Sequence, residues 1–145
     1  MMKKVIIAGS RNFDRYDILE KTMRMKFSER IIIVSGCAKG ADRLGERYAK
    51  ENMLEVERHP ARWDDISVQP CHIKHNSRGA YNALAGHNRN REMLQSVLDN
   101  PDGGCLVAFW DGVSTGTRNM ITIAHAAGIQ VHVIKYVSSN ACSSI

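Results

Sequence analysis

Several short segments of this chain contain the residue types that bind phosphate groups. The longest is 111–119, Asp-Gly-Val-Ser-Thr-Gly-Thr-Arg-Asn, which follows the apolar run 105–110 and opens an amphipathic segment near Thr117. Its glycines let the backbone approach a ligand closely, and the hydroxyls of Ser114 and Thr115 can donate hydrogen bonds. The free N–H groups and positive dipole end of a following helix favour an anion. The segment therefore predicts a phosphate-bearing ligand.

Two earlier segments have the same character. Gly9-Ser10-Arg11 closes a short β-branched run, and 35–42, Ser-Gly-Cys-Ala-Lys-Gly-Ala-Asp, follows the apolar run 30–34. When strands alternate with helices, every strand-to-helix turn lies at one edge of the sheet, so the three segments should converge. Glycines after parallel strands often serve only the tight geometry of a turn. Three such turns together favour a nucleotide-sized site.

The residues expected to bind the ligand come from these turns and from one helix. Arg89 and Asn90 stand near the start of a helix expected over 86–98, where Arg89 can reach the sheet edge and counter negative charge. Asp42 could accept ribose hydroxyls or only complement the dipole of its helix. The full expected set is Gly9, Ser10, Arg11, Ser35, Gly36, Lys39, Gly40, Asp42, Arg89, Asn90, Asp111, Gly112, Ser114, Thr115, Gly116 and Thr117.

The stretch 60–83 has no hydrophobic period, and it contains Trp63. A tryptophan ring there could stack on a base or plug the edge of the core. A stretch of this length without its own structure is usually a functional lid or a mobile loop. Within it, 71–75 (Cys-His-Ile-Lys-His) has no second ligand cluster at zinc-like spacing, although His87 is a stray candidate. We therefore expect a solvated loop and no metal.

Two common phosphate-binding signatures are absent. The turn from Gly36 to Gly40 lacks the pattern GxxxxGK[ST], and Gly9 does not begin a GxGxxG fingerprint. The sequence thus argues against a P-loop NTPase and an ordinary dinucleotide dehydrogenase. Lys39 by itself is best interpreted as a solvated charge.

Composition narrows the class of protein. The 145 residues suffice for one domain, and 43% hydrophobic with 24% charged residues is ordinary for a soluble globular chain. The net charge of +5 favours anionic partners, but the lysines and arginines form no basic block. No apolar run approaches the roughly 18 residues of a membrane span, and the scattered cysteines suit a reducing compartment. We expect a cytoplasmic protein with no membrane partner.

The hydrophobic pattern predicts five strands alternating with four helices, and hence a Rossmann-like, doubly wound parallel sheet. Asp14 or Asp17 is expected to cap the first helix, and Met53 to extend the apolar stripe of the second. Gly128 should end the last helix in a left-handed conformation. Residues 1–137 are expected to form the domain and 138–145 a flexible tail. The expected strands are 4–8, 30–34, 54–58, 105–110 and 130–136, and the expected helices run to about 28, from about 41, over 86–98 and through 127.

Five motifs in order resemble the YspA-like branch of the SLOG superfamily. The resemblance runs from about residue 3 to 136, with 70–83 as an apparent insertion. The motifs are Gly9-Ser10-Arg11, Ser35-Gly36-x-Ala38-x-Gly40-Ala41-Asp42, Pro60-Ala61-x-Trp63, Ala85-Gly86-x-x-Arg89-Asn90-x-x-Met93 and Phe109-Trp110-Asp111-Gly112-x-Ser114-x-Gly116-Thr117.

This resemblance implies a Rossmann-like fold and a nucleotide or nucleotide-derived ligand. The wider superfamily includes the Lonely-guy phosphoribohydrolases, the DNA-processing protein A fold and sensor domains for NAD-derived signals. The phosphoribohydrolases carry PGGxGTxxE after the fourth strand, but here Met120 stands where their catalytic glutamate would be. A thioether can neither stabilise an oxocarbenium ion nor handle a water molecule as a carboxylate does.

Three hypotheses follow. The leading one is a non-catalytic binder of a nucleotide-type ligand, acting as a sensor or sequestering protein. The second is a nucleotide N-glycosidase or phosphate-bond hydrolase that uses Arg89, Asp111 and Asp42. Single-stranded nucleic-acid binding ranks last, because no aromatic-studded basic groove is evident. Relatives in the superfamily often self-associate, so a homo-oligomer is expected. Met23, Met25, Met93 and Leu98 are interface candidates, although core packing explains them equally well.

Overall fold

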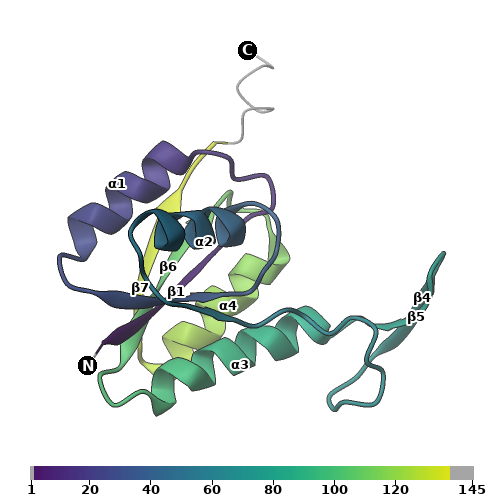
Figure 1. The fold of residues 1–145 in the computed structure, drawn as a ribbon. Helices are drawn as coiled ribbons and strands as arrows, with labels where there is room; N and C mark the ends of the chain where they lie inside the picture. The colour runs from purple at the N-terminus through teal and green to yellow at the C-terminus, as the bar shows by residue number, and fades with distance from the viewer. Residues whose placement is uncertain (1, 138–145) are drawn as a thin grey trace.

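A parallel sheet of five strands forms the centre of the molecule, in the order β3-β2-β1-β6-β7 (Figure 1). The chain winds outward from β1 to β3 and then crosses back to place β6 on the other side of β1. The strand order therefore reverses between β1 and β6, the position where α/β sheets bind ligands. The computed structural model describes residues 2–137, and the expected tail 138–145 lies outside them. The strands are β1 (Lys3–Gly9), β2 (Ile31–Ser35), β3 (Val56–Arg58), β6 (Gly104–Trp110) and β7 (Gln130–Lys135).

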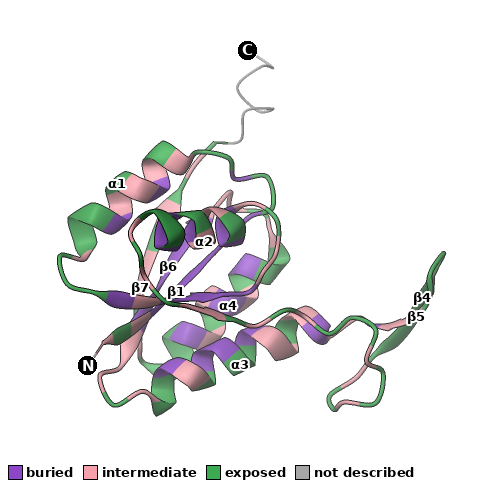
Figure 2. Cartoon of the chain, in the orientation of Figure 1, coloured by how far each residue is buried: buried purple, intermediate pink, exposed green. Residues whose placement is uncertain are grey.

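Four helices cover the two faces of this sheet, which confirms the predicted Rossmann-like α/β fold. Alternate residues of β1 point to opposite faces, so Val5 and Ile7 join one core cluster while Ile6 and Ala8 join the other. The first cluster lies under α1 and α2, and the second under α3 and α4 (Figure 2). This two-sided burial explains the continuous apolar runs of the central strands. The helices are α1 (Tyr16–Lys26), α2 (Ala41–Glu51), α3 (Ala85–Asp99) and α4 (Thr115–Ala127).

The sequence predicted no regular structure in the stretch 60–83, and this prediction was wrong. The stretch contains an antiparallel hairpin of β4 (Ile73–Asn76) and β5 (Gly79–Asn82), which projects from the body as part of an arm, residues 64–82 (Figure 1). The turn is held by the Asn76 side chain, whose Oδ1 accepts a hydrogen bond from the amide of Arg78 at 2.8 Å. All four residues of β4 are exposed, so no apolar alternation marks the strand in the sequence.

Some expectations about helix ends were wrong. Arg15, not Asp14 or Asp17, is the N-cap residue of α1, and the Asp17 carboxylate pairs with the Arg15 guanidinium instead. Met53 lies beyond α2 and is 81% exposed, with a left-handed backbone. Gly128 does end α4 in the left-handed region, as predicted.

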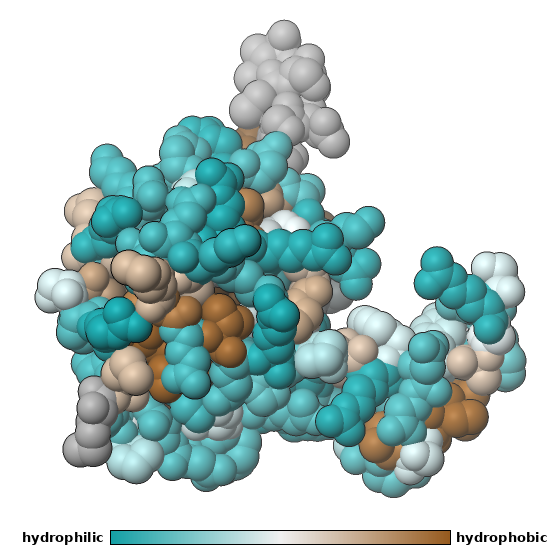
Figure 3. All heavy atoms as spheres, in the orientation of Figure 1, coloured by the Kyte–Doolittle hydropathy of each residue, from teal (hydrophilic) through white to brown (hydrophobic). Residues whose placement is uncertain are grey.

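The proposed interface residues divide into two groups. Met23 and Met93 are buried in the two core clusters, so they cannot form an oligomer interface. Leu98 is half exposed. Met25 and Leu98 remain available at the surface, and apolar atoms are also visible on the arm (Figure 3). Self-association stays a prediction. None of the helices within residues 2–137 has both the length and the apolar character needed to cross a bilayer.

Candidate functional site

A cavity of about 480 Å³ opens at the carboxyl ends of β1 and β6, where the strand order reverses. Twelve of the seventeen residues expected to contact a ligand, Trp63 included, line it. Ser35, Gly36, Lys39, Gly40 and Gly112 do not. The lining residues that the sequence predicted are Gly9, Ser10, Arg11, Asp42, Trp63, Arg89, Asn90, Asp111, Ser114, Thr115, Gly116 and Thr117.

The first turn of α4 presents unpaired amides to this cavity. Ser114 is the N-cap residue, and the amides of Thr115, Gly116 and Thr117 have no hydrogen-bond acceptor within residues 2–137. A Cβ atom added at Gly116 would meet no atom within 4 Å, so the space in front of this turn is open. Three free donors and the positive end of the helix dipole make this the strongest anion-binding feature of the cavity.

Asp111 shapes the turn that precedes these amides. Its Oδ1 accepts hydrogen bonds from the amides of Val113 (2.9 Å) and Ser114 (2.8 Å). Partial burial raises the pKa of Asp111, but the hydrogen bonds from Ser114 and Val113 outweigh it and hold the pKa below its usual value. The carboxylate is therefore ionised and built into the loop, and the turn positions α4 rather than offering its own amides to a ligand.

The turn after β1 joins the other two segments. The amide of Ser10 donates to the Phe109 carbonyl at 3.0 Å, and the Ser10 hydroxyl accepts from the amide of Asp111 at 3.2 Å. A side chain at Gly9 would overlap the Phe109 carbonyl oxygen, 2.4 Å from the added Cβ. Gly9 thus permits close packing of β1 on β6. Arg11 is exposed at the cavity and supplies a cationic side chain there.

Most of the turn after β2 contacts other parts of the protein and does not line the cavity, so its role in ligand binding stays a prediction. The Ser35 hydroxyl donates to Glu46 at 2.6 Å, away from the cavity, and Lys39 is exposed to solvent. Gly40 has a φ of +81°, and an added Cβ would lie 2.3 Å from the Ser10 carbonyl oxygen. These residues dock the start of α2 against the β1 turn. Of this segment, Ala38 and Asp42 line the cavity.

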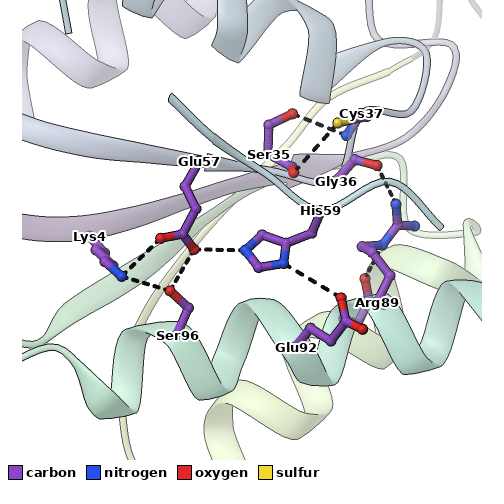
Figure 4. A network of polar contacts seen from close by, with 10 residues as sticks. Lys4, Ser35, Gly36, Cys37, Glu57, His59, Arg89, Glu92 and Ser96 are labelled. Carbon is purple, nitrogen blue, oxygen red and sulfur yellow. Dashed lines mark hydrogen bonds and ion pairs between the residues drawn. The ribbon is translucent and has the colours of Figure 1, made fainter. Parts of the chain in front are cut away.

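Arg89 and Asp42 approach each other around Gly36, which explains the glycine. The Nη1 of Arg89 donates to the Gly36 carbonyl at 2.5 Å, as Figure 4 shows, and Asp42 Oδ2 accepts from the Ala38 amide at 3.2 Å. A Cβ at Gly36 would lie 2.7 Å from Arg89 Nη1 and 2.8 Å from Asp42 Oδ2. The glycine therefore makes room for the side chains that form this wall of the cavity.

The two charged groups have opposite pKa shifts with one cause. Burial raises the pKa of Asp42 to about 6, and the Ala38 amide and the Arg89 charge only partly offset it. Burial likewise lowers the pKa of Arg89, although a guanidinium stays protonated at any physiological pH. The cavity thus contains a permanent cation beside a carboxyl that titrates near neutral pH.

Asn90 positions the first turn of α4. It is 4% exposed, and its Nδ2 donates to the Gly116 carbonyl (3.2 Å) and to Asn119 Oδ1 (2.9 Å), while its Oδ1 accepts from Arg89 Nε at 3.0 Å. One buried amide therefore links α3 to the first turn of α4 and fixes Arg89. Its partners in the protein use both ends of the amide, so the role of Asn90 that the structure shows is to hold its neighbours in place.

Two hydrophobic side chains complete the cavity. Trp63 is 39% exposed, and a Cβ added at Gly86 would lie 3.3 Å from its ring, so the indole covers the start of α3. Met120 is 1% exposed and lines the cavity beside Met93. At this position the side chain can pack against a ligand, but it cannot transfer a proton.

The sequence missed several residues that build the site. Asn82, fully buried, accepts hydrogen bonds through Oδ1 from the amides of His72 (3.1 Å) and Leu84 (2.9 Å) and so fixes the entry to α3. A lone asparagine in an aperiodic stretch carries no signal of such a role. His87 lines the cavity, and its place two residues before Arg89 was available as a signal. Within residues 2–137, no group of three or more His, Cys, Asp or Glu side chains is placed to hold a metal ion.

A second polar network lies at the opposite end of α3 (Figure 4). Glu57 receives hydrogen bonds from His59 (2.7 Å) and Ser96 (2.5 Å) and pairs with Lys4 at 2.9 Å. Partial burial would raise the pKa of Glu57, but these partners, His59 first, lower it to about 2. None of the four residues lines the cavity, so the network fastens β1, β3 and α3 together.

Comparison with known protein families identifies a related family. Residues 3–65 match the YAcAr model, which describes the YspA, cpYpsA-related SLOG family. The matched part includes the β1 and β2 turns, Asp42 and Trp63. No curated protein and no solved structure matches the chain.

Proposed function

The chain is a YspA-like SLOG protein, and we propose that it binds a phosphate-bearing nucleotide or nucleotide-derived signal without turning it over. Membership of the SLOG family indicates binding or processing of a nucleotide-related ligand. The observation that carries the proposal is the set of three unpaired amides, Thr115 to Thr117, facing a cavity of about 480 Å³. Such a cavity has the size of a small-molecule site.

The lining residues suggest how the ligand lies. A phosphate accepts hydrogen bonds from the α4 amides and from the Ser114 hydroxyl, with Arg11 and Arg89 countering its charge. Trp63, which also lines the cavity, offers an aromatic face to a base. The carboxyl of Asp42 can accept a ribose hydroxyl. A phosphate, a sugar and a base thus each find matching chemistry.

The proposed absence of turnover is supported by Met120, which stands where the phosphoribohydrolases carry their catalytic glutamate. Cleavage of an N-glycosidic bond develops positive charge on the sugar, and a carboxylate beside the anomeric carbon stabilises it. Removing a general acid or base of this kind typically lowers the rate by a factor of about 10²–10⁴. A binder that retains its ligand intact acts as a sensor or sequesters a signalling molecule.

Calorimetry with a panel of nucleotides, ADP-ribose and cyclic dinucleotides tests this proposal. The sharpest variant is Gly116→Asp, because the open space at this position accepts a side chain and a carboxylate suits a helix N-terminus. We expect the variant to fold normally and to bind at least tenfold more weakly, since the new charge repels the phosphate. Gly116→Asn, of nearly equal volume and without charge, is the matched control and should lose less affinity. Absence of binding across the whole panel would refute the proposal.

One observation favours hydrolysis as a second candidate. Asp42 is a buried carboxyl at the cavity with a pKa of about 6, the range in which a side chain exchanges protons during catalysis. Arg89 beside it could stabilise a leaving phosphate. An enzyme of this kind releases free base or phosphate from a nucleotide panel, and Arg89→Ala abolishes the release. If no nucleotide in the panel is consumed, this candidate is eliminated.

A further inference from the structure

A second, smaller cavity lies behind Arg89. Its volume is about 230 Å³, and it is enclosed by the base of the arm and the first turns of α3. Arg89 is the residue that the two cavities share. Neighbouring residues of the chain line different cavities: Trp63 and Ala83 line the first, whereas Arg62 and Asn82 line the second. The two cavities are therefore opposite sides of one partition.

This partition is rigidly built. The amide of Asn82 donates to the Trp63 carbonyl at 2.7 Å, which closes the two ends of the arm on each other. Within the described residues, Nη1 and Nε of Arg89 have hydrogen-bond acceptors in the protein, but Nη2 has none. A guanidinium fixed by two of its nitrogens and free at the third is prepared to bind an anion.

The second cavity also has the charge of an anion site. Arg62 and Arg91 join Arg89 in its wall, and Arg91 Nη2 is held by Asn88 Oδ1 at 2.6 Å. The carboxylate in the wall belongs to Glu92, whose Oε2 lies 3.5 Å from His59 Nδ1 (Figure 4). Three arginines and one glutamate in the lining give this cavity a net charge of +2. The excess of positive charge favours an anion there.

We infer that the second cavity is a phosphate subsite and that the ligand carries two separate phosphoryl groups. The inference rests on the proposed function, because the first phosphate occupies the start of α4. The second would be bound by Arg62 and Arg91, with Arg89 between the two. The ligand class is then a nucleoside bisphosphate or a linear dinucleotide rather than a nucleoside monophosphate.

Isothermal titration calorimetry with AMP, adenosine 3′,5′-bisphosphate and the dinucleotide pApA tests this inference. We expect at least one of the two-phosphate compounds to bind the wild-type protein tenfold or more tightly than AMP. In the double variant Arg62→Gln/Arg91→Gln this gain should vanish while the affinity for AMP stays the same. Both side chains are exposed, so the variant should keep its melting temperature. Lys74→Gln removes a charge from β4, outside both cavities, and is the matched control that should leave the gain intact.

The outcomes separate the two proposals. Equal affinities of the three compounds for the wild-type protein, or a gain that survives in the double variant, would overturn the two-phosphate inference and leave nucleotide binding in place. A gain that Lys74→Gln also abolishes would mean that overall charge is responsible and would overturn it as well. If none of the three compounds binds and the wider nucleotide panel is also silent, both proposals fail.

Discussion

The turns after β2 and β6 are similar in sequence, but their backbone amides have different hydrogen-bond partners. Each follows a buried strand, contains two glycines and opens a helix. In the β2 turn the amides of Cys37, Ala38 and Ala41 bond to groups of the protein itself. In the β6 turn Asp111 fixes the loop, and the next three amides stay open to the cavity. The number of glycines in a turn is therefore a poor indicator of ligand binding. Whether the backbone amides already have acceptors within the protein is a better one.

The largest difference between the two turns is expected in stability, when one glycine in each turn is replaced by alanine. Gly40→Ala places a Cβ 2.3 Å from a carbonyl oxygen in a left-handed backbone, so we expect it to lower the free energy of unfolding by about 3–5 kcal/mol. Gly116→Ala meets open space and should change it by less than about 1 kcal/mol. Urea unfolding followed by circular dichroism measures both. Similar losses in the two variants would mean that the turns do not differ as described.

The carboxylates of the two turns provide the second test, since their pKa values move in opposite directions. The pKa of Asp42 is raised to about 6 in the folded protein, so the folded state binds more protons than the unfolded state between about pH 4 and 6. The contribution of Asp42 to stability is therefore fully present below about pH 4 and is lost as the pH rises to 6, a change of about 3 kcal/mol. Asp42→Asn should remove this pH dependence. Unfolding curves of both proteins from pH 4 to 7 check it, and parallel profiles would contradict the prediction.

The smallest effect is expected at Asp111. Asp111→Ala leaves two amides without their acceptor, and because water can reach them the loss should be about 1 kcal/mol. The pKa of Asp111 is lowered, so its contribution is present at neutral pH and is lost as the pH falls through the folded pKa. Asp111→Asn keeps an acceptor oxygen and should lose less than Asp111→Ala. Thermal melts at pH 7 and pH 3 measure the difference, and an equal loss at both pH values would argue against the role assigned to the carboxylate.

The fold could be predicted because its signals are local and repeated. The runs at Val5–Ala8, 31–34 and 105–109 are buried on both faces, and their spacing with helical stretches admits few topologies. The hairpin of the arm could not be predicted from the sequence. Its first strand is exposed, and its turn depends on one side-chain hydrogen bond at Asn76. Regular hydrophobic burial leaves a period in the sequence, and a projecting hairpin leaves none.

The candidate site could be predicted in its position but not in all its members. Convergence of the turns follows from topology, and Arg89 does reach the sheet edge. Gly36 and Gly40 were assigned to the ligand because a glycine that relieves a clash and a glycine that admits a phosphate look the same in a sequence. Arg62 and Arg91 were missed because their proximity depends on the path of the arm. Only the three-dimensional arrangement separates these cases.

The hydrogen bond between the amide of Asn82 and the carbonyl of Trp63 has a consequence for the changes that the arm can tolerate. It holds the two ends of the arm together, so insertions or deletions at the turn between β4 and β5 should leave the sheet and the helices in place. The base of the arm is different, because Asn82 fixes the entry to α3 and the Asn88 side chain donates to the Pro70 carbonyl at 2.9 Å. We therefore expect tolerance to sequence change to increase from the base of the arm to its tip.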